Sequence, residues 1–220
     1  MPIENKDIQY TVGIEDLYLC LMKGNDTSHA LPAYEDIVYR QTNISDLTIS
    51  TTSTNFTKWA SNKKIINIVK NTAFGLAFNL AGLNREVKDK IFAKIRKKGV
   101  SFETAKPKEY PKFAVGVVFP LNDGTKLVRW YPKCTVAPVE ESWKTQNEEM
   151  TVDDIAYTIT ADPLLYNDVT QAELDTGYPE AKGIKVEDFL QQVICDESQL
   201  AQLGGTVTPK PPETPKTTEK

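Results

Sequence analysis

Alternating apolar and polar residues predict β-strands along most of this chain. Phe74, Leu76, Phe78 and Leu80 recur at every second position, which places all four side chains on one face of a strand. Shorter stretches with strand character lie at residues 10–22, 34–41, 43–50, 65–69 and 155–160. The pattern therefore favours a mainly β fold.

One pair of strands carries its own turn signal. Residues 113–119 are apolar nearly throughout, and residues 126–131 return with strand character. The Asn-Asp-Gly sequence at 122–124 lies between them and is the best hairpin turn signal in the chain. Pro132 follows the second strand and indicates an edge position or a bulge.

A long polar segment separates two of the predicted strands. Residues 50–55 read Ser-Thr-Thr-Ser-Thr-Asn, a run that cannot pack a core, and strand character resumes at Trp59 and at residues 65–69. We therefore expect residues 48–66 to leave the body of the protein as a long, polar-tipped β-hairpin arm.

The hydrophobic period changes after Leu80. Val87, Ile91 and Ile95 recur at every fourth position, which predicts an amphipathic helix over about residues 84–98. Asn84 is a plausible N-cap, and Gly99 a plausible residue just past the C-terminus of the helix. A second, short helix is predicted over residues 185–196.

Together these elements predict a mainly β fold of seven or eight strands, a β-sandwich or barrel with one helix packed on it. We expect residues 1–163 to form this β domain and residues 164–203 to form an acidic extension with a short helix. Residues 204–220 contain four prolines and many Thr and Lys residues, a composition typical of a disordered tail.

Charge is divided unevenly along the 220 residues. The net charge of −4 conceals a balance of +2 over residues 1–161 and −6 over residues 162–220. No apolar run is long enough for a membrane span, and the first residues lack the apolar core of a signal peptide, so we expect neither. Three widely spaced cysteines do not form a disulfide framework, which favours a reducing compartment.

Catalytic chemistry finds little support in the sequence. A single histidine, His29, excludes any metal site that needs two histidines, and no phosphate-binding loop or nucleophile-elbow motif is present. Cys20 and Cys134 lie in apolar strands, where a buried structural thiol is the expected role. We expect a protein without catalytic residues, metal or cofactor.

The predicted helix and its end carry the densest positive charge, a net of +5 over residues 84–99. The simplest interpretation is the solvated face of an amphipathic helix. Contact with an acidic surface of a neighbouring copy, or binding of nucleic acid, would use the same residues. The candidate basic surface consists of Lys94, Arg96, Lys97 and Lys98.

Several stretches resemble the major tail protein family of long, non-contractile-tailed phages of Gram-positive bacteria. Residues 112–139 match its hydrophobic strand, charged turn and aromatic-x-x-Cys-x-Val pattern, here Tyr131 to Val136. Residues 155–163 match its strand ending in an Ala-Asp-Pro step, and residues 12–18 are similar to its opening. The resemblance covers about residues 10–163.

This resemblance implies a tail tube fold and a structural role in the virion, assembled in the host cytoplasm. Such subunits form hexameric rings that stack around a lumen through which DNA passes without specific binding. The implied partners are further copies of the chain and the tail terminator, baseplate or initiator, and tape measure proteins, with no membrane. The arm becomes an inter-ring contact, with candidate residues Thr51, Thr52, Asn55, Phe56, Trp59 and Lys63.

Two other functions stay open on the sequence. A nucleic-acid-binding module would use the basic helix at 84–99 and would bind with a steep salt dependence. A tube subunit of a bacterial injection system would share the fold of the phage protein.

Overall fold

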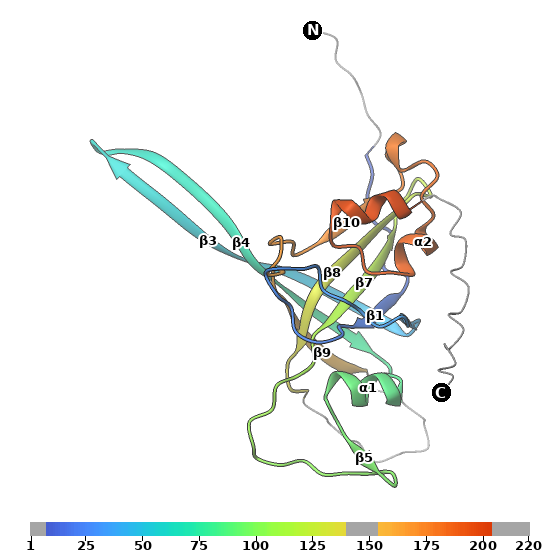
Figure 1. Ribbon diagram of the computed structural model, residues 1–220. Helices are drawn as coiled ribbons and strands as arrows, with labels where there is room; N and C mark the ends of the chain where they lie inside the picture. Colours follow the sequence, from blue (N-terminus) through green and yellow to red (C-terminus); the bar gives the residue numbers. More distant parts are fainter. Residues whose placement is uncertain (1–7, 140–153, 204–220) are drawn as a thin grey trace, which may run out of the picture.

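A single antiparallel sheet organises the computed structural model, which describes residues 8–139 and 154–203. The sheet contains eight strands in the order β2-β1-β7-β8-β9-β4-β3, with β10 also paired to β8 (Figure 1). The strands are β1 Leu17–Leu21, β2 Tyr39–Gln41, β3 Ile44–Ala60, β4 Lys63–Leu80, β7 Phe113–Pro120, β8 Lys126–Val136, β9 Ile155–Ala161 and β10 Ala172–Asp175. The mainly β fold class is confirmed.

Six smaller elements complete the described chain. They are α1 Arg85–Ile91, the two-stranded hairpin β5 Arg96–Lys97 and β6 Val100–Ser101, the 3-10 helices η1 Pro179–Ala181 and η2 Glu197–Gln202, and α2 Val186–Leu190. Figure 1 shows α1 and β5 at one end of the sheet and the segment with β10 and α2 at the opposite end. The short helix expected over residues 185–196 is therefore present but ends at Leu190.

Strand β8 changes neighbours along its length because it bends at a bulge. Its register with β7 shifts between the pairs Val115–Tyr131 and Phe113–Cys134, so one extra residue is accommodated beside Pro132. Before the bulge β8 pairs with β10, and after it β8 pairs with β9. The expected hairpin at Asn122-Asp123-Gly124 is confirmed, and of the two alternatives at Pro132, an edge position or a bulge, the structure has a bulge.

The first core lies where the sheet curls over and faces itself, which gives the fold its sandwich-like form. Leu19 from β1, Phe78 from β4 and Ile159 from β9 line one small cavity in this core. Helix α1 contributes Val87 and Ile91, both buried, to the same cluster. The apolar face predicted for Phe74, Leu76, Phe78 and Leu80 is confirmed, with Phe74 only partly buried.

A second core lies on the other face of the sheet and explains why β7 is apolar throughout. Ala114 and Val118 point away from the first core and pack beneath the segment 172–203, together with Trp130. The segment supplies Phe189 and Leu190 from α2 and further apolar residues from the chain that follows, Val193, Ile194 and Leu203. Residues 164–203 therefore cover one face of the sheet.

Polar contacts also fasten this segment to the sheet. The Trp130 indole N–H donates to the backbone oxygen of Phe189 at 2.9 Å. A partly buried ion pair joins Lys133 on β8 to Asp26 at 2.8 Å, and the same carboxylate oxygen of Asp26 accepts from the backbone N–H of Leu165. The expected division of the chain into a β domain of residues 1–163 and an extension of residues 164–203 stays a prediction. The expected disordered tail at 204–220 lies outside the described residues.

Candidate functional site

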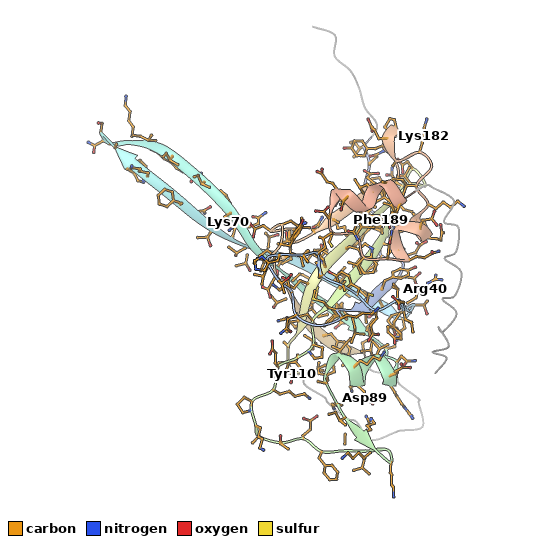
Figure 2. All side chains as sticks on the ribbon, viewed as in Figure 1. Arg40, Lys70, Asp89, Tyr110, Lys182 and Phe189 are labelled. Atoms are coloured by element: carbon orange, nitrogen blue, oxygen red, sulfur yellow. The ribbon has the colours of Figure 1, made fainter. Side chains whose placement is uncertain are left out.

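The expected hairpin arm is present and is the most prominent feature of the molecule (Figure 1). Strand β9 pairs with β4 only from Phe74 to Leu80, so β3 and β4 continue beyond it as a two-stranded ribbon. Ser61 and Asn62 connect the strands with φ of +51° and +59°, as a type I′ turn requires. We refer to residues 51–73 as the arm; Figure 2 shows Lys70 on it.

The arm exposes large apolar side chains on both faces. Phe56 pairs directly with Ile68, while their neighbours Asn55 and Val69 pair on the opposite face. Trp59 and Ile65 are 64% and 61% exposed, and Phe56, Ile68 and Val69 are similarly open. Six of the large exposed hydrophobic residues of the described chain therefore lie on the arm: Phe56, Trp59, Ile65, Ile66, Ile68 and Val69.

Such a ribbon is suited to binding another molecule rather than to stabilising its own domain. An isolated two-stranded hairpin has marginal stability in water. Fully burying a side chain such as Phe or Ile contributes about 1.5–3 kcal/mol, and the arm leaves several of them in solvent. The lysines Lys58, Lys63, Lys64 and Lys70 lie among the apolar residues of the arm, as expected of an edge protected against indiscriminate pairing.

All six arm residues expected from the sequence lie on this ribbon. Five are on β3, and Lys63 begins β4. The strand character expected over residues 65–69 is confirmed, because these residues lie on β4. The sequence made no prediction of exposure for Ile65, Ile68 and Val69, which belong to an apolar run. The structure exposes all three, and the only sequence signal was their position directly after the polar segment 50–64.

Helix α1 is shorter than predicted: it ends at Ile91, and Lys94, Arg96, Lys97 and Lys98 are not helical. Ala93, with φ of +46°, reverses the chain. The N–H of Ala93 donates to the oxygen of Lys90 and the N–H of Lys94 to that of Asp89, which is a Schellman motif. Asn84 caps the N-terminus, as predicted.

The helix ends early because Ile95, the third residue of the apolar series Val87, Ile91 and Ile95, is not buried. Val87 and Ile91 are buried in the first core, whereas Ile95 is 79% exposed. A further helical turn would gain no apolar contact there. Gly99, expected to follow the helix, instead forms the tight turn between β5 and β6 together with Lys98, both with positive φ.

Two of the four candidate basic residues are already paired within the chain. The Arg96 guanidinium donates to both carboxylate oxygens of Asp89, and this hydrogen bonding holds the pKa of Asp89 below its usual range. Lys94 pairs with Glu103 at 3.7 Å. Lys97 and Lys98 are exposed, and neither has an ion-pair partner among the residues that the structure describes.

A charged groove of about 590 Å³ separates the sheet from α2. Four of its five charged side chains neutralise one another in pairs, and the fifth is Glu187. Arg40 donates to Asp16 at 2.6 Å, and Lys126 donates to Glu15 at 2.7 Å. The hydrogen bond that Arg40 donates to Asp16 also raises the pKa of Arg40. The groove therefore offers no uncommitted charged group from either pair.

The three cysteines are buried and free, as expected for Cys20 and Cys134. Burial raises the pKa of the Cys20 and Cys195 thiols to about 11 and raises that of Cys134 further. His29 lies on an exposed loop. Within residues 8–139 and 154–203, no three His, Cys, Asp or Glu side chains are grouped to hold a metal, and no helix has the length and apolarity to cross a membrane.

No protein-family model matches this chain, and no curated protein matches it. Among solved structures, the chain is similar to one in the "Cryo-EM structure of the anti-feeding prophage (AFP) baseplate, 6-fold symmetrised". The match has 8% identity and a TM-score of 0.36, and it covers 78% of this chain and 97% of that chain. A TM-score this low does not establish a common fold, so the function has to be argued from this chain's own residues.

Proposed function

We propose that this protein is the structural subunit of a phage tail tube and forms stacked hexameric rings around a lumen for DNA. The observation that carries the proposal is the arm, which exposes Phe56, Trp59 and Ile68 far from the body. A second copy in an adjacent ring would cover these side chains. The sequence resemblance over residues 10–163 to phage major tail proteins supports the same function.

The edges of the sheet also support self-assembly. The strand order ends at β2 and β3, so each has one edge without a strand partner among the described residues. Unpaired edges bind further strands, and closing a ring of copies would satisfy both edges at once. Tail terminator, initiator and tape measure proteins belong to the same proposal as partners at the ends and inside the tube.

The alternative of a nucleic-acid-binding module is less well supported. Its surface would need free basic side chains on a helix, but Arg96 and Lys94 pair with Asp89 and Glu103, and neither lies on α1. A gel shift at low salt with and without the changes Lys94→Ala, Arg96→Ala, Lys97→Ala and Lys98→Ala separates the two functions. Tight binding that is lost in the variant would favour nucleic acid.

Electron microscopy of the concentrated protein tests the tube directly. We expect rings or tubes for the unaltered chain and mostly single subunits for the double variant Phe56→Ser with Trp59→Ser. A matched control, Ser53→Thr with Thr54→Ser, changes two exposed polar residues on the same strand and should assemble normally. Single subunits under every condition for the unaltered chain would contradict the proposal.

A further inference from the structure

The two ends of the sheet carry opposite charge. Residues 84–112, the basic end, contain ten Lys and Arg against four Asp and Glu, a formal charge of +6. Residues 164–203, the acidic end, contain two basic and eight acidic residues, a formal charge of −6. Figure 1 shows α1 and β5 of the basic end far from the segment with β10 and α2, and Figure 2 shows Asp89 and Lys182 at these opposite ends.

Each end combines exposed apolar side chains with charged side chains that have no ion-pair partner among the described residues. At the basic end, the β5–β6 hairpin exposes Lys97 and Lys98, and Ile95 and Phe102 beside it are 79% and 82% exposed. At the acidic end, Glu180 and Glu187 are exposed and have no ion-pair partner among the described residues. Exposed apolar residues of the same segment include Tyr178, two residues before Glu180, and Leu200.

The β5–β6 hairpin has the form of a contact element rather than of a part of the core. It forms a separate two-stranded sheet, which is marginally stable by itself. The bidentate contact of Arg96 with Asp89 fastens it to α1 and leaves Lys97 and Lys98 at its turn. Val100 and Phe102 on the returning side remain open to solvent.

We propose that the basic end of one copy docks on the acidic end of the next, so that copies join head to tail. Lys97 and Lys98 would face Glu180 and Glu187 of the next copy, and Ile95 and Phe102 would be covered by its exposed apolar residues. This inference deepens the proposed function, on which it rests, by naming a second contact besides the arm.

A second copy fits this surface better than nucleic acid does. A basic surface that binds phosphates does not need apolar side chains at its centre, whereas protein interfaces place apolar residues inside a charged rim. The same chain supplies the complementary charge at its other end. A contact between two different surfaces repeats from copy to copy, and it produces a ring or a stack rather than a closed pair.

Charge reversal with complementation tests the contact. One variant carries Lys97→Glu and Lys98→Glu, and a second carries Glu180→Lys and Glu187→Lys. Sedimentation and electron microscopy at low salt should show each variant alone with an apparent association constant reduced about tenfold or more. An equimolar mixture should assemble again, because each reversed end then meets a reversed partner while the unaltered ends still match.

Further variants and measurements keep the outcome interpretable. The variant Lys97→Arg with Lys98→Arg retains the charge and should assemble like the unaltered chain. Circular dichroism checks that every variant is folded, and Lys97→Gln with Lys98→Gln provides a milder change that should also weaken assembly. Assembly should weaken as salt is raised.

The possible failures are distinguishable. If the unaltered chain assembles and both reversed variants assemble equally well, the head-to-tail contact is wrong while the tube function stands. If each reversed variant fails and the mixture also fails, charge complementarity between these two ends is overturned. If the unaltered chain never assembles, both proposals are overturned.

Discussion

The indole N–H of Trp130 donates a hydrogen bond to the backbone oxygen of Phe189 at 2.9 Å, across 59 residues of sequence. Both side chains are buried, and they belong to the second core. The contact makes the acidic extension part of the packing of the sheet, although its composition suggests an appendage.

This relationship predicts that a chain ending at Pro163 will not fold stably. The truncation exposes Trp130, Val128 and Val118, which are at most 2% exposed in the whole chain. We expect loss of cooperative denaturant unfolding and aggregation at low concentration. A chain ending at Leu203 is the control and should unfold like the full chain. A stable fragment 1–163 would contradict the prediction.

The hydrogen bond itself can be removed while an aromatic ring is kept at position 130. Trp130→Phe leaves the Phe189 oxygen without its donor and should lower the free energy of unfolding by about 1–3 kcal/mol from the lost bond. Because the phenyl ring is smaller than the indole, the substitution also removes packing contacts, which lowers the free energy of unfolding further. Urea titration followed by tyrosine fluorescence and circular dichroism measures the change, and a difference below measurement error would contradict it.

Gly116 provides a test of packing against the same indole. A Cβ at Gly116 would lie 2.9 Å from the Trp130 ring, so Gly116→Ala forces the ring or the strand to move. We expect a loss of about 1–3 kcal/mol in the free energy of unfolding. Gly82→Ala is the matched control, because a Cβ there meets nothing within 4 Å. Equal stability of the two variants would overturn this account of the core.

The buried thiols predict a stability loss at high pH. Burial raises the pKa of Cys20 and Cys195 to about 11, whereas in the unfolded chain thiols ionise near 9. Because the unfolded state loses its protons first, the stability that the neutral thiols contribute is present below pH 9 and is lost as pH rises toward 11. Urea unfolding at several pH values measures how steeply the free energy of unfolding falls with pH.

The variant Cys20→Ser with Cys195→Ser is the control and should have a flatter slope over the same pH range. The folded protein should also react with iodoacetamide at pH 8 much more slowly than the protein in urea. Rapid alkylation of the folded protein would contradict the burial of these thiols.

The ion pair between Asp89 and Arg96 predicts a measurable titration. Arg96→Gln removes the hydrogen bonds that lower the pKa of Asp89, so this pKa should return toward its ordinary value. The pKa is followed by NMR of the carboxyl group, with Lys97→Gln as the control. The lowered pKa of Asp89 stabilises the folded state at pH values above the pKa that Asp89 has in the unfolded chain, and this contribution is lost as the pH falls. The variant lacks this contribution, so its free energy of unfolding should decrease less than that of the unaltered chain as the pH falls. An unchanged pKa would contradict the contact.

Much of the fold could be read from local patterns. The alternation at Phe74–Leu80, the hairpin turn at 122–124 and the bulge at Pro132 depend on residues close in sequence, and all appear in the structure. The arm was also foreseeable, because a polar run such as 50–55 cannot enter a core. Its exposed Ile65 and Val69 were not, because an apolar run has the same pattern in a buried strand as on an uncovered ribbon.

The sequence by itself determined the β class, the arm, the N-cap at Asn84 and the opposite charges of residues 84–112 and 164–203, since each follows from residue type and local spacing. Only the tertiary structure decided where α1 ends and what covers β7. Ile95 continues the helical pattern, but no apolar surface lies there to bury it, so the chain turns at Ala93. Phe189 covers Trp130 because burial is decided by contacts between distant segments, which no local pattern specifies.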